Sequence, residues 1–452
     1  MTPLLLVSFA LAEEPAAGAP VELTVHGNLK TFVLGGKPHQ WFEFSDGAET
    51  LLGSLGVDPD EALDAYGLAA DPFAEGVASG RLQVGVSYGA FRLDLHWAGS
   101  AASSAPSTGA AGFGTGVGLT APELVPLSWS PDTGSGVTLR HRIDRLVLSA
   151  KLPHLDVALG RQAVSFGVGR FFTPLDLVSP FGPATIDTEW KPGVDALRLD
   201  AYAGMATKVT AAAAWAGKPV FGDDARDEGR PVLDDLVLAA FAQTTVGVTD
   251  LGVFAGDVRS EAVFGLNAVS ALGPVGVHAE ASLTLPNVDD PFVRAVAGAD
   301  WRPGDQTTLT GEVYAQSFGA TKPEDYLDAL DSPRVKRGEL WEAGQLYAAV
   351  AVAQEITPLV SGNVAVISNV RDPSALLSVA IAWNVADNAD VALGAYAGLG
   401  AAPDPIALDF ALDPNTGAPS LAAPTDAALS DAVNSEFGLY PAMGFVQAKA
   451  YF

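Results

Sequence analysis

Residues 275–285, "VGVHAEASLTL", alternate between apolar and polar side chains along the whole segment. Val275, Val277, Leu283 and Leu285 share one face of an extended chain with two alanines, whereas His278 and the other polar residues share the opposite face. Successive side chains of a β-strand point to opposite sides of the sheet. The pattern therefore predicts a strand with one apolar and one polar face.

The same alternation recurs along the chain, for example in residues 308–316 and 377–385. We count about eighteen such segments of roughly 9–11 residues, which is the length of a tilted strand that crosses a bilayer. Their approximate centres are residues 27, 84, 94, 143, 159, 199, 211, 240, 254, 267, 280, 297, 312, 348, 365, 380, 394 and 447.

The connections between these segments fall into two classes that alternate along the chain. Every second connection is short, and the other set contains every long excursion: residues 36–79, 101–136, 166–193, 217–232, 319–339 and 400–440. Short periplasmic turns with long extracellular loops are typical of outer-membrane barrels. The sequence thus predicts an all-β protein, a transmembrane antiparallel up-and-down β-barrel of about 18 strands, with 16 strands as the alternative.

Residue types on the two faces support a membrane barrel. The apolar faces carry mainly Leu, Val and Ala, and the polar faces carry small polar residues with occasional charges, as a wet lumen requires. Large aromatic residues lie near strand ends, which predicts interfacial girdles that include Trp97, Trp215, Trp301, Trp383 and Phe452. Capping patterns at Asp58, Thr321 and Thr425 predict short helices in three of the long loops.

Composition excludes several classes of function. The net charge is −28, from 53 acidic and 25 basic residues, so nucleic acid is not an expected partner. The chain has no cysteine, and its six histidines form no H-x-x-x-H pair, so we expect no metal and no cofactor. The G-x-S-x-G match at residues 85–89 lies in a predicted hairpin rather than a strand-to-helix elbow, so we expect no catalytic residues and no enzyme.

The ends of the chain carry targeting signals. Residues 1–12 read as a secretory signal peptide, with a small-x-small cleavage site at Ala10–Ala12, followed by a linker over residues 13–20 and the barrel over residues 21–452. The apolar alternating last strand ends in Phe452, as in barrels that present a C-terminal signal to the outer-membrane assembly machinery. We therefore expect the outer membrane of a Gram-negative-type cell.

Arginines and carboxylates cluster on three consecutive predicted strands and the loop between two of them. The candidate pore-lining and selectivity residues are Arg140, Arg142, Arg161, Arg170, Arg198, Asp144, Asp176, Asp187 and Asp200. Facing charges create a transverse field that sorts ions and polar solutes. A structural salt-bridge network explains the same cluster equally well. The alternation slips near Asp144, and Arg161 shares its face with leucines, which suggests a bulge or a position above the membrane.

The third external loop, residues 166–193, contains four phenylalanines and four prolines. A stiff loop with apolar anchors can fold inward and narrow a wide barrel, because eighteen open strands leave a large aqueous hole. We therefore predict that this loop is the constriction.

Residues 159–183, followed by "KPGVDALRLDAY", resemble a segment of porin-type outer-membrane proteins, including relatives of the alginate-export barrel. Leu159-Gly160-Arg161-Gln162 match the end of a strand in that family, and Ser179-Pro180 stand where Asn-Pro is common. The resemblance implies a monomeric or homotrimeric barrel that conducts solutes.

The function expected from these observations is passive passage of small solutes through an outer-membrane channel. The expected partners are membrane lipid, lipopolysaccharide, the assembly machinery and the solutes themselves. Two alternatives remain: a specific exporter or importer of a polysaccharide or hydrophobic molecule, and a non-conducting surface adhesin or structural barrel.

Overall fold

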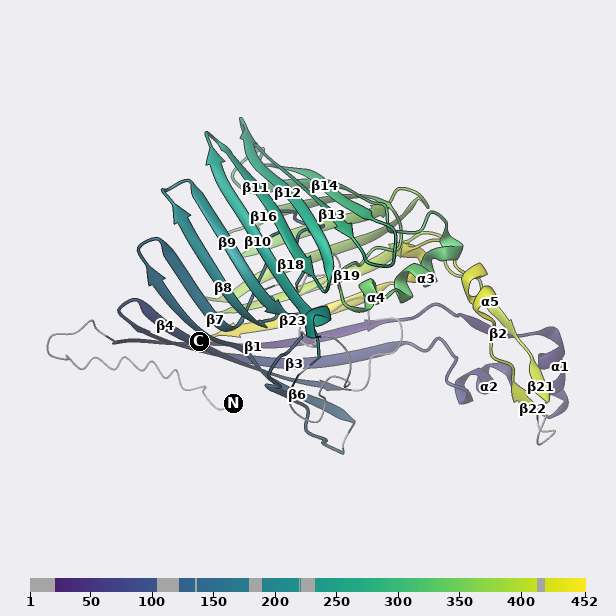
Figure 1. Cartoon of the computed structure of the whole chain (residues 1–452). Helices are drawn as coiled ribbons and strands as arrows, with labels where there is room; N and C mark the ends of the chain where they lie inside the picture. The colour runs from purple at the N-terminus through teal and green to yellow at the C-terminus, as the bar shows by residue number, and fades with distance from the viewer. Residues whose placement is uncertain are drawn as a thin grey trace, which may run out of the picture.

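The computed structural model describes residues 21–103, 122–134, 136–178, 189–218, 220, 232–412 and 419–452. The expected signal peptide, the linker 13–20, Asp187 and Ser179-Pro180 lie outside the described residues. Figure 1 shows one large sheet rolled into a barrel, with hairpin turns at its left end and loops and short helices at its right end.

Eighteen long strands form the wall, and each is antiparallel to its neighbours. They are β1 (Val21–Gly36), β3 (Phe73–Tyr88), β4 (Phe91–Ser103), β6 (Val137–Leu152), β7 (Leu155–Gln162), β8 (Val194–Ala203), β9 (Thr207–Trp215), β10 (Leu236–Val246), β11 (Thr249–Val258), β12 (Glu261–Leu272), β13 (Val275–Leu285), β14 (Phe292–Trp301), β15 (Thr307–Gln316), β16 (Leu346–Thr357), β17 (Val360–Asn369), β18 (Ser374–Ala386), β19 (Ala389–Leu399) and β23 (Met443–Tyr451). The barrel closes where β1 pairs with β23, with Leu29 opposite Ala450. The predicted eighteen-stranded barrel is confirmed, and each predicted centre lies in a different strand.

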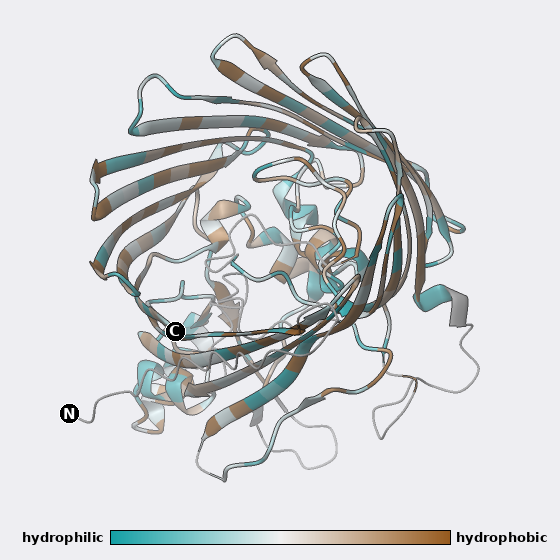
Figure 2. Ribbon diagram, turned by 90° about the vertical axis from the view of Figure 1, so that its left-hand side faces the viewer, coloured by the Kyte–Doolittle hydropathy of each residue, from teal (hydrophilic) through white to brown (hydrophobic). Residues whose placement is uncertain are grey.

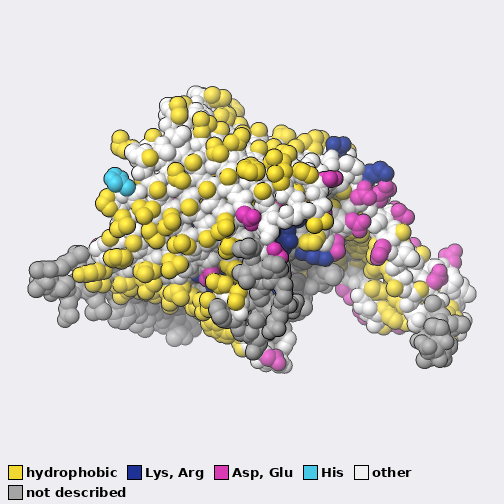
Figure 3. All heavy atoms as spheres, in the orientation of Figure 1, with side chains coloured by type: hydrophobic (Ala, Val, Ile, Leu, Met, Phe, Trp, Pro, Cys, Tyr) yellow, Lys and Arg dark blue, Asp and Glu magenta, His cyan; other side chains and the backbone are white. Residues whose placement is uncertain are grey.

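The apolar side chains face outward. In β13, Leu283 and Leu285 are each 37% exposed, whereas Glu280, Ser282 and Thr284 on the alternate positions are buried. A water-soluble barrel would bury the leucines, so this arrangement is that of a barrel surrounded by lipid. Figure 3 shows the resulting apolar cover over the strands, and Figure 2 shows the ring that the strands form.

At one end of the barrel every connection is a short turn, whereas the other end has all the long loops and also the two-residue turn at Arg259 and Ser260. Gly89 and Gly247 adopt φ values of 57° and 65° in two of these turns, a conformation that costs a residue with a Cβ atom free energy. Every long connection lies at the opposite end, as the alternation of connection lengths predicts.

The predicted aromatic girdle forms only in part. Trp301 and Trp383 lie at strand ends beside the turns and are 44% and 54% exposed. Trp215 is buried instead, and its indole N–H donates to the Lys218 carbonyl at 3.0 Å. The strand-end position is therefore not sufficient to place a tryptophan in the interface, because a loop can cover it.

Short elements occupy the external connections. They are α1 (Asp46–Ser54), α2 (Pro59–Ala65), α3 (Tyr326–Asp331), α4 (Pro333–Lys336), α5 (Asp426–Asp431), the 3-10 turns η1 (Val232–Asp235), η2 (Pro323–Asp325) and η3 (Phe437–Leu439), and the strands β2 (Phe42–Phe44), β5 (Ser128–Trp129), β20 (Ile406–Leu408), β21 (Phe410–Leu412) and β22 (Pro419–Leu421). Asp58 and Thr425 cap α2 and α5 through their side chains as predicted. The cap predicted at Thr321 is wrong, because Lys322 is the residue that precedes η2 and its side chain makes no capping hydrogen bond. Within the described residues, no helix is long and apolar enough to cross a bilayer.

The first and last external loops build a small folded unit, which we call the external module (residues 41–72 and 404–421 as far as described). Strand β2 pairs with β20 in parallel, and Phe44, Leu52, Leu63 and Leu408 form a separate buried core. Figure 1 shows the module projecting from the barrel. Residues 38–72 and 400–436 contain fourteen carboxylates and no Lys or Arg, which is half of the net charge of −28.

Candidate functional site

The loop between β7 and β8 folds into the barrel, and Glu280 on β13 holds its outgoing limb. The Glu280 carboxylate accepts hydrogen bonds from the backbone N–H of Val168, at 2.5 Å, and from that of Leu175. Glu280 is 2% exposed and lies on the inward face of its strand. A buried carboxylate needs such donors to offset its loss of hydration, so the loop and the wall satisfy each other.

A second wall carboxylate, Glu312 on β15, binds the same limb. It accepts backbone N–H hydrogen bonds from Phe171 at 2.9 Å, from Phe172 at 3.1 Å and from Arg170. The Nε2 atom of His278 lies 2.7 Å from Oε1 of this carboxylate, the oxygen that also accepts from Arg170. The inward-facing polar residues of β13 and β15 are therefore attachment points for the loop backbone.

Apolar side chains of the loop pack against the same wall. Phe172 stacks on Tyr314 with ring centroids 4.7 Å apart, and Phe166 packs against Phe254 at 5.4 Å. Phe172 and Phe254 are almost fully buried, as is Leu175. These contacts bury apolar area inside the barrel, so the predicted apolar anchoring of the loop is what the structure contains.

The returning limb of the loop contacts the opposite side of the barrel. Glu189 lies 2.8 Å from the Lys30 ammonium of β1, and Trp190 packs 4.9 Å from the guanidinium of Arg81 on β3. In the strand order, β1 and β3 are far around the barrel from β13 and β15. The described residues of the loop therefore contact walls on opposite sides of the lumen, and we call residues 166–193 the crossing loop.

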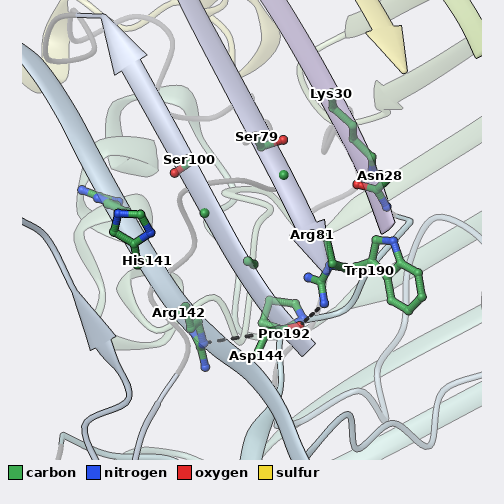
Figure 4. Close-up of a pocket in the computed structure, with 14 residues that line it drawn as sticks. Asn28, Lys30, Ser79, Arg81, Ser100, His141, Arg142, Asp144, Trp190 and Pro192 are labelled. Carbon is green, nitrogen blue, oxygen red and sulfur yellow. Dashed lines mark hydrogen bonds and ion pairs between the residues drawn. The ribbon is translucent and has the colours of Figure 1, made fainter. Parts of the chain in front are cut away.

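Positive charge gathers in a recess between the returning limb and the wall, which we call the basic recess (Figure 4). Its charged lining residues are Lys30, Arg81, Arg140, Arg142 and Asp144, and Asn28, Ser79, Ser100, His141 and Trp190 complete the polar lining. Arg140 is the most exposed of its four cations. In a chain with a net charge of −28, this recess is a local positive field that faces the lumen.

Asp144 is the centre of the charge network behind the recess. It is 3% exposed and pairs with Arg81 at 2.7 Å and Arg145 at 2.8 Å, and the Gly193 N–H donates to it at 3.0 Å. A β-bulge at Asp144 interrupts the pairing of β6 with β4. The bulge explains the slip in the sequence alternation, because the extra residue lets neighbouring charged side chains reach the same side.

Arg142 is tied to the same network. Its guanidinium donates to the Gly193 carbonyl at 2.7 Å and lies 3.4 Å from Glu123. A Cβ atom on Gly193 would lie 2.1 Å from the Asp144 carbonyl oxygen, so only glycine fits where the loop returns to the wall. Arg142 and Asp144 therefore belong to a structural salt-bridge network, which is the alternative that the sequence left open.

Arg161 does not line the lumen. Its side chain is 0% exposed and pairs with Asp195 at 2.8 Å and Glu123 at 3.0 Å, with further hydrogen bonds to the carbonyls of Ile143 and Val125. Here β7 ends at Gln162, and β5 takes its place beside β6. Arg161 thus fastens the second external loop to the wall.

The remaining candidates are dispersed. Arg170 is 53% exposed on the crossing loop and pairs with Asp300 of β14 at 3.0 Å. Arg198 and Asp200 pair with each other at 2.9 Å on β8. Asp176 lies in the loop against Lys191; burial raises its pKa, and the ammonium opposes that rise.

Sequence reasoning missed five residues that shape the lumen: Lys30, Arg81, Glu189, Glu280 and Glu312. All but Glu189 lie on strands at positions that the alternation assigns to the polar face, so the sequence predicts that their side chains point into the lumen. The sequence does not predict their partners, because these residues contact a loop that is distant from them in the chain. Among the described residues, no group of three or more His, Asp or Glu side chains is arranged to hold a metal.

Known structures with a similar fold exist, although no family profile and no curated protein matches the sequence. The OccD3 (OpdP) structure from Pseudomonas aeruginosa aligns with a TM-score of 0.50 and 8% identity over 97% of this chain and 93% of its own. A BenF-like porin from Pseudomonas fluorescens Pf-5 aligns with a TM-score of 0.53 and 11% identity, covering 95% and 98%.

The chain has a porin-type fold. OccK9 (OpdG) from Pseudomonas aeruginosa gives the same result, with a TM-score of 0.51 and 10% identity over 95% of this chain and 98% of its own. At these identities the likeness concerns the fold of the barrel and carries no solute from those porins to this chain. The similarity to a porin-type barrel that the sequence suggested is thereby established at the level of fold.

Proposed function

We propose that this protein is an outer-membrane channel for the passive passage of small solutes, with the loop over residues 166–193 as its constriction. The observation that carries the proposal is the crossing loop: it binds Glu280 and Glu312 on one wall and Lys30 and Arg81 on the other. A loop that spans a lipid-embedded barrel narrows the path without removing it.

In this proposal, the ion selectivity of the channel comes from those arginines of the predicted lumenal cluster that face solvent. Arg140 in the basic recess and Arg170 on the loop are the exposed members. Arg142, Arg161 and Asp144 support the wall and the loop through buried pairs. Arg198, Asp200, Asp176 and Asp187 belong to the same proposal as charges of the lumen or its loop.

The test is ion selectivity of the refolded protein in planar bilayers. We expect open-channel currents, and we expect Arg140→Gln to shift the reversal potential in a salt gradient toward cation preference. Lys151→Gln removes an exposed charge beside the turn after β6 and serves as the matched control. An unchanged reversal potential for Arg140→Gln removes this arginine from the selectivity mechanism, and the absence of any current removes the channel proposal.

A surface role is the second candidate, and the external module favours it. A non-conducting adhesin or structural barrel has use for a folded, acidic unit that projects from the membrane. Absence of conductance in the intact protein, with conductance restored by shortening residues 166–193, supports this candidate over the first. A specific exporter related to the alginate-export barrels rests on the match at Leu159–Gln162 alone.

The proposal includes contacts beyond the solute. Lipid and lipopolysaccharide face the apolar exterior, and Phe452, 53% exposed, is the residue offered to the assembly machinery. Its backbone pairs with Gly27 across the closure of the barrel, at 2.8 and 2.9 Å. A homotrimer and the absence of enzymatic activity are parts of the same proposal, and crosslinking in membranes tests the trimer.

A further inference from the structure

Three external connections meet at the carboxyl group of Glu436. This residue lies in the loop between β19 and β23 and is 3% exposed. One carboxyl oxygen accepts the N–H of Ala343, in the loop between β15 and β16, at 2.9 Å. The other accepts the amide of Asn369, at the end of β17, at 2.7 Å, and also the hydroxyl of Tyr347.

A second layer of hydrogen bonds surrounds this carboxyl group. The Glu436 N–H donates to Asp372, in the β17–β18 turn, at 2.6 Å. The Gly344 N–H donates to the Tyr347 hydroxyl at 2.5 Å. We call Ala343, Tyr347, Asn369, Asp372 and Glu436 the loop latch. Tyr347 and Asn369 are 0% exposed, so the latch is enclosed where these loops cover the rim of β16–β19.

Among the described residues, no Lys or Arg pairs with the carboxyl group of Glu436. The titratable groups that face it within the described residues are the carboxyls of Glu342 and Asp372 and the hydroxyls of Tyr326, Tyr347 and Tyr440. Ionisation of Glu436 therefore places a negative charge in a buried space that already faces other carboxyls.

We propose that Glu436 is a pH-responsive latch, which holds the three external connections together when its carboxyl group is protonated and loosens them when it ionises. The device needs only a buried acid shared by separate loops, and this structure provides one. The proposal concerns the loops themselves and does not depend on the identity of the solute.

The direction of the response follows from linkage. Burial raises the pKa of Glu436 to about 7, opposed by the hydrogen bonds from Tyr347, Ala343 and Asn369, whereas the released side chain titrates at its ordinary value of 4.5. A group with a raised pKa in the closed state stabilises that state in acid and loses this effect as pH rises. Between pH 6 and pH 8, the ratio of closed to open loops is expected to fall about tenfold.

Hydrogen exchange of the refolded full-length protein tests the latch directly. We expect peptides from residues 317–345 and 432–441 to lose about tenfold protection between pH 6 and pH 8 after correction for intrinsic exchange. Glu436→Gln carries no charge at either pH and is expected to abolish that difference. Asp431→Asn, an exposed carboxyl in the same loop, is the matched control and is expected to behave as the unmodified protein.

Two results overturn the latch: equal protection at both pH values in the unmodified protein, or a pH response that survives in Glu436→Gln. If Glu436→Gln does not refold, Asn369→Ala, which removes a donor to the carboxyl group, is expected to shift the midpoint of the response upward in pH. An unshifted midpoint in that variant also counts against the latch. Hydrogen exchange does not depend on conductance. A protein that carries no current therefore contradicts the channel proposal but not the latch.

Discussion

At the scale of single residues, most charges inside this barrel are paired, and the pairs differ greatly in burial. Arg161 is completely buried between Asp195 and Glu123, whereas Arg198 is 32% exposed beside its partner Asp200. Removing one member of a buried pair leaves the others uncompensated. Solvent screens a partly exposed pair, so its loss matters less.

We expect Arg161→Leu to lower the free energy of unfolding by about 3–5 kcal/mol, because two carboxylates lose their buried counter-charge. Arg198→Leu makes the same substitution at the partly exposed pair and is expected to lower the free energy of unfolding by no more than about 1 kcal/mol. Urea titration of the refolded variants in lipid vesicles measures both values. Equal losses would contradict a fastening role for Arg161.

At the scale of structural elements, the crossing loop is held largely through its backbone. The carboxylates of Glu280 and Glu312 accept hydrogen bonds from five backbone N–H groups of the loop, those of Val168, Arg170, Phe171, Phe172 and Leu175. Side-chain substitutions in the loop leave these bonds in place. The wall residues Glu280 and Glu312 therefore decide the position of the loop.

We expect Glu280→Gln and Glu312→Gln each to lower the free energy of opening of residues 164–178 by about 1.5–3 kcal/mol, since hydrogen bonds to charged groups contribute that much. Glu355→Gln changes an exposed carboxyl near the turn after β16 and is the control. Faster exchange of the loop, with noisier single-channel currents, is the expected readout. Unchanged exchange in both wall variants would mean that the apolar anchors alone hold the loop.

At the scale of the whole molecule, the barrel exposes apolar side chains on its outer surface and buries polar side chains inside, which is the reverse of a soluble protein. Leu266, at the middle of β12, is 60% exposed, while the neighbouring Asn267 is 7% exposed inside the barrel. Acidic residues gather at the external end, where Figure 3 shows them over the helices and the external module. Lipid around the strands and water at both ends account for this distribution.

We expect Leu266→Arg to lower the free energy of unfolding in bilayers by about 2–4 kcal/mol, the cost of an arginine on the lipid face at mid-depth. Leu272, 64% exposed at the end of the same strand beside the turn, is the matched position, and Leu272→Arg is expected to cost about 1 kcal/mol or less. Similar costs at both depths, measured in the same vesicles, would speak against a lipid-facing exterior.

Local sequence accounts for the wall of the barrel. Alternation such as that of residues 275–285 depends only on neighbouring side chains, and a strand in lipid must point its leucines outward whatever its partners are. Strand number, the two classes of connection and even the bulge at Asp144 were therefore visible, because each leaves a mark within a few residues. Lengths of strands were less visible, since β6 continues to Val137, beyond the core of the segment.

Tertiary structure alone decided the contents of the barrel. Arg161 and Arg170 lie nine residues apart, yet one is sealed in the wall and the other is exposed on the crossing loop. Glu436 meets Asn369 and Ala343 only because three connections converge on one rim. Contacts of this kind join residues that are distant in the chain, and the free energy of each depends on burial and on partners that no local pattern encodes.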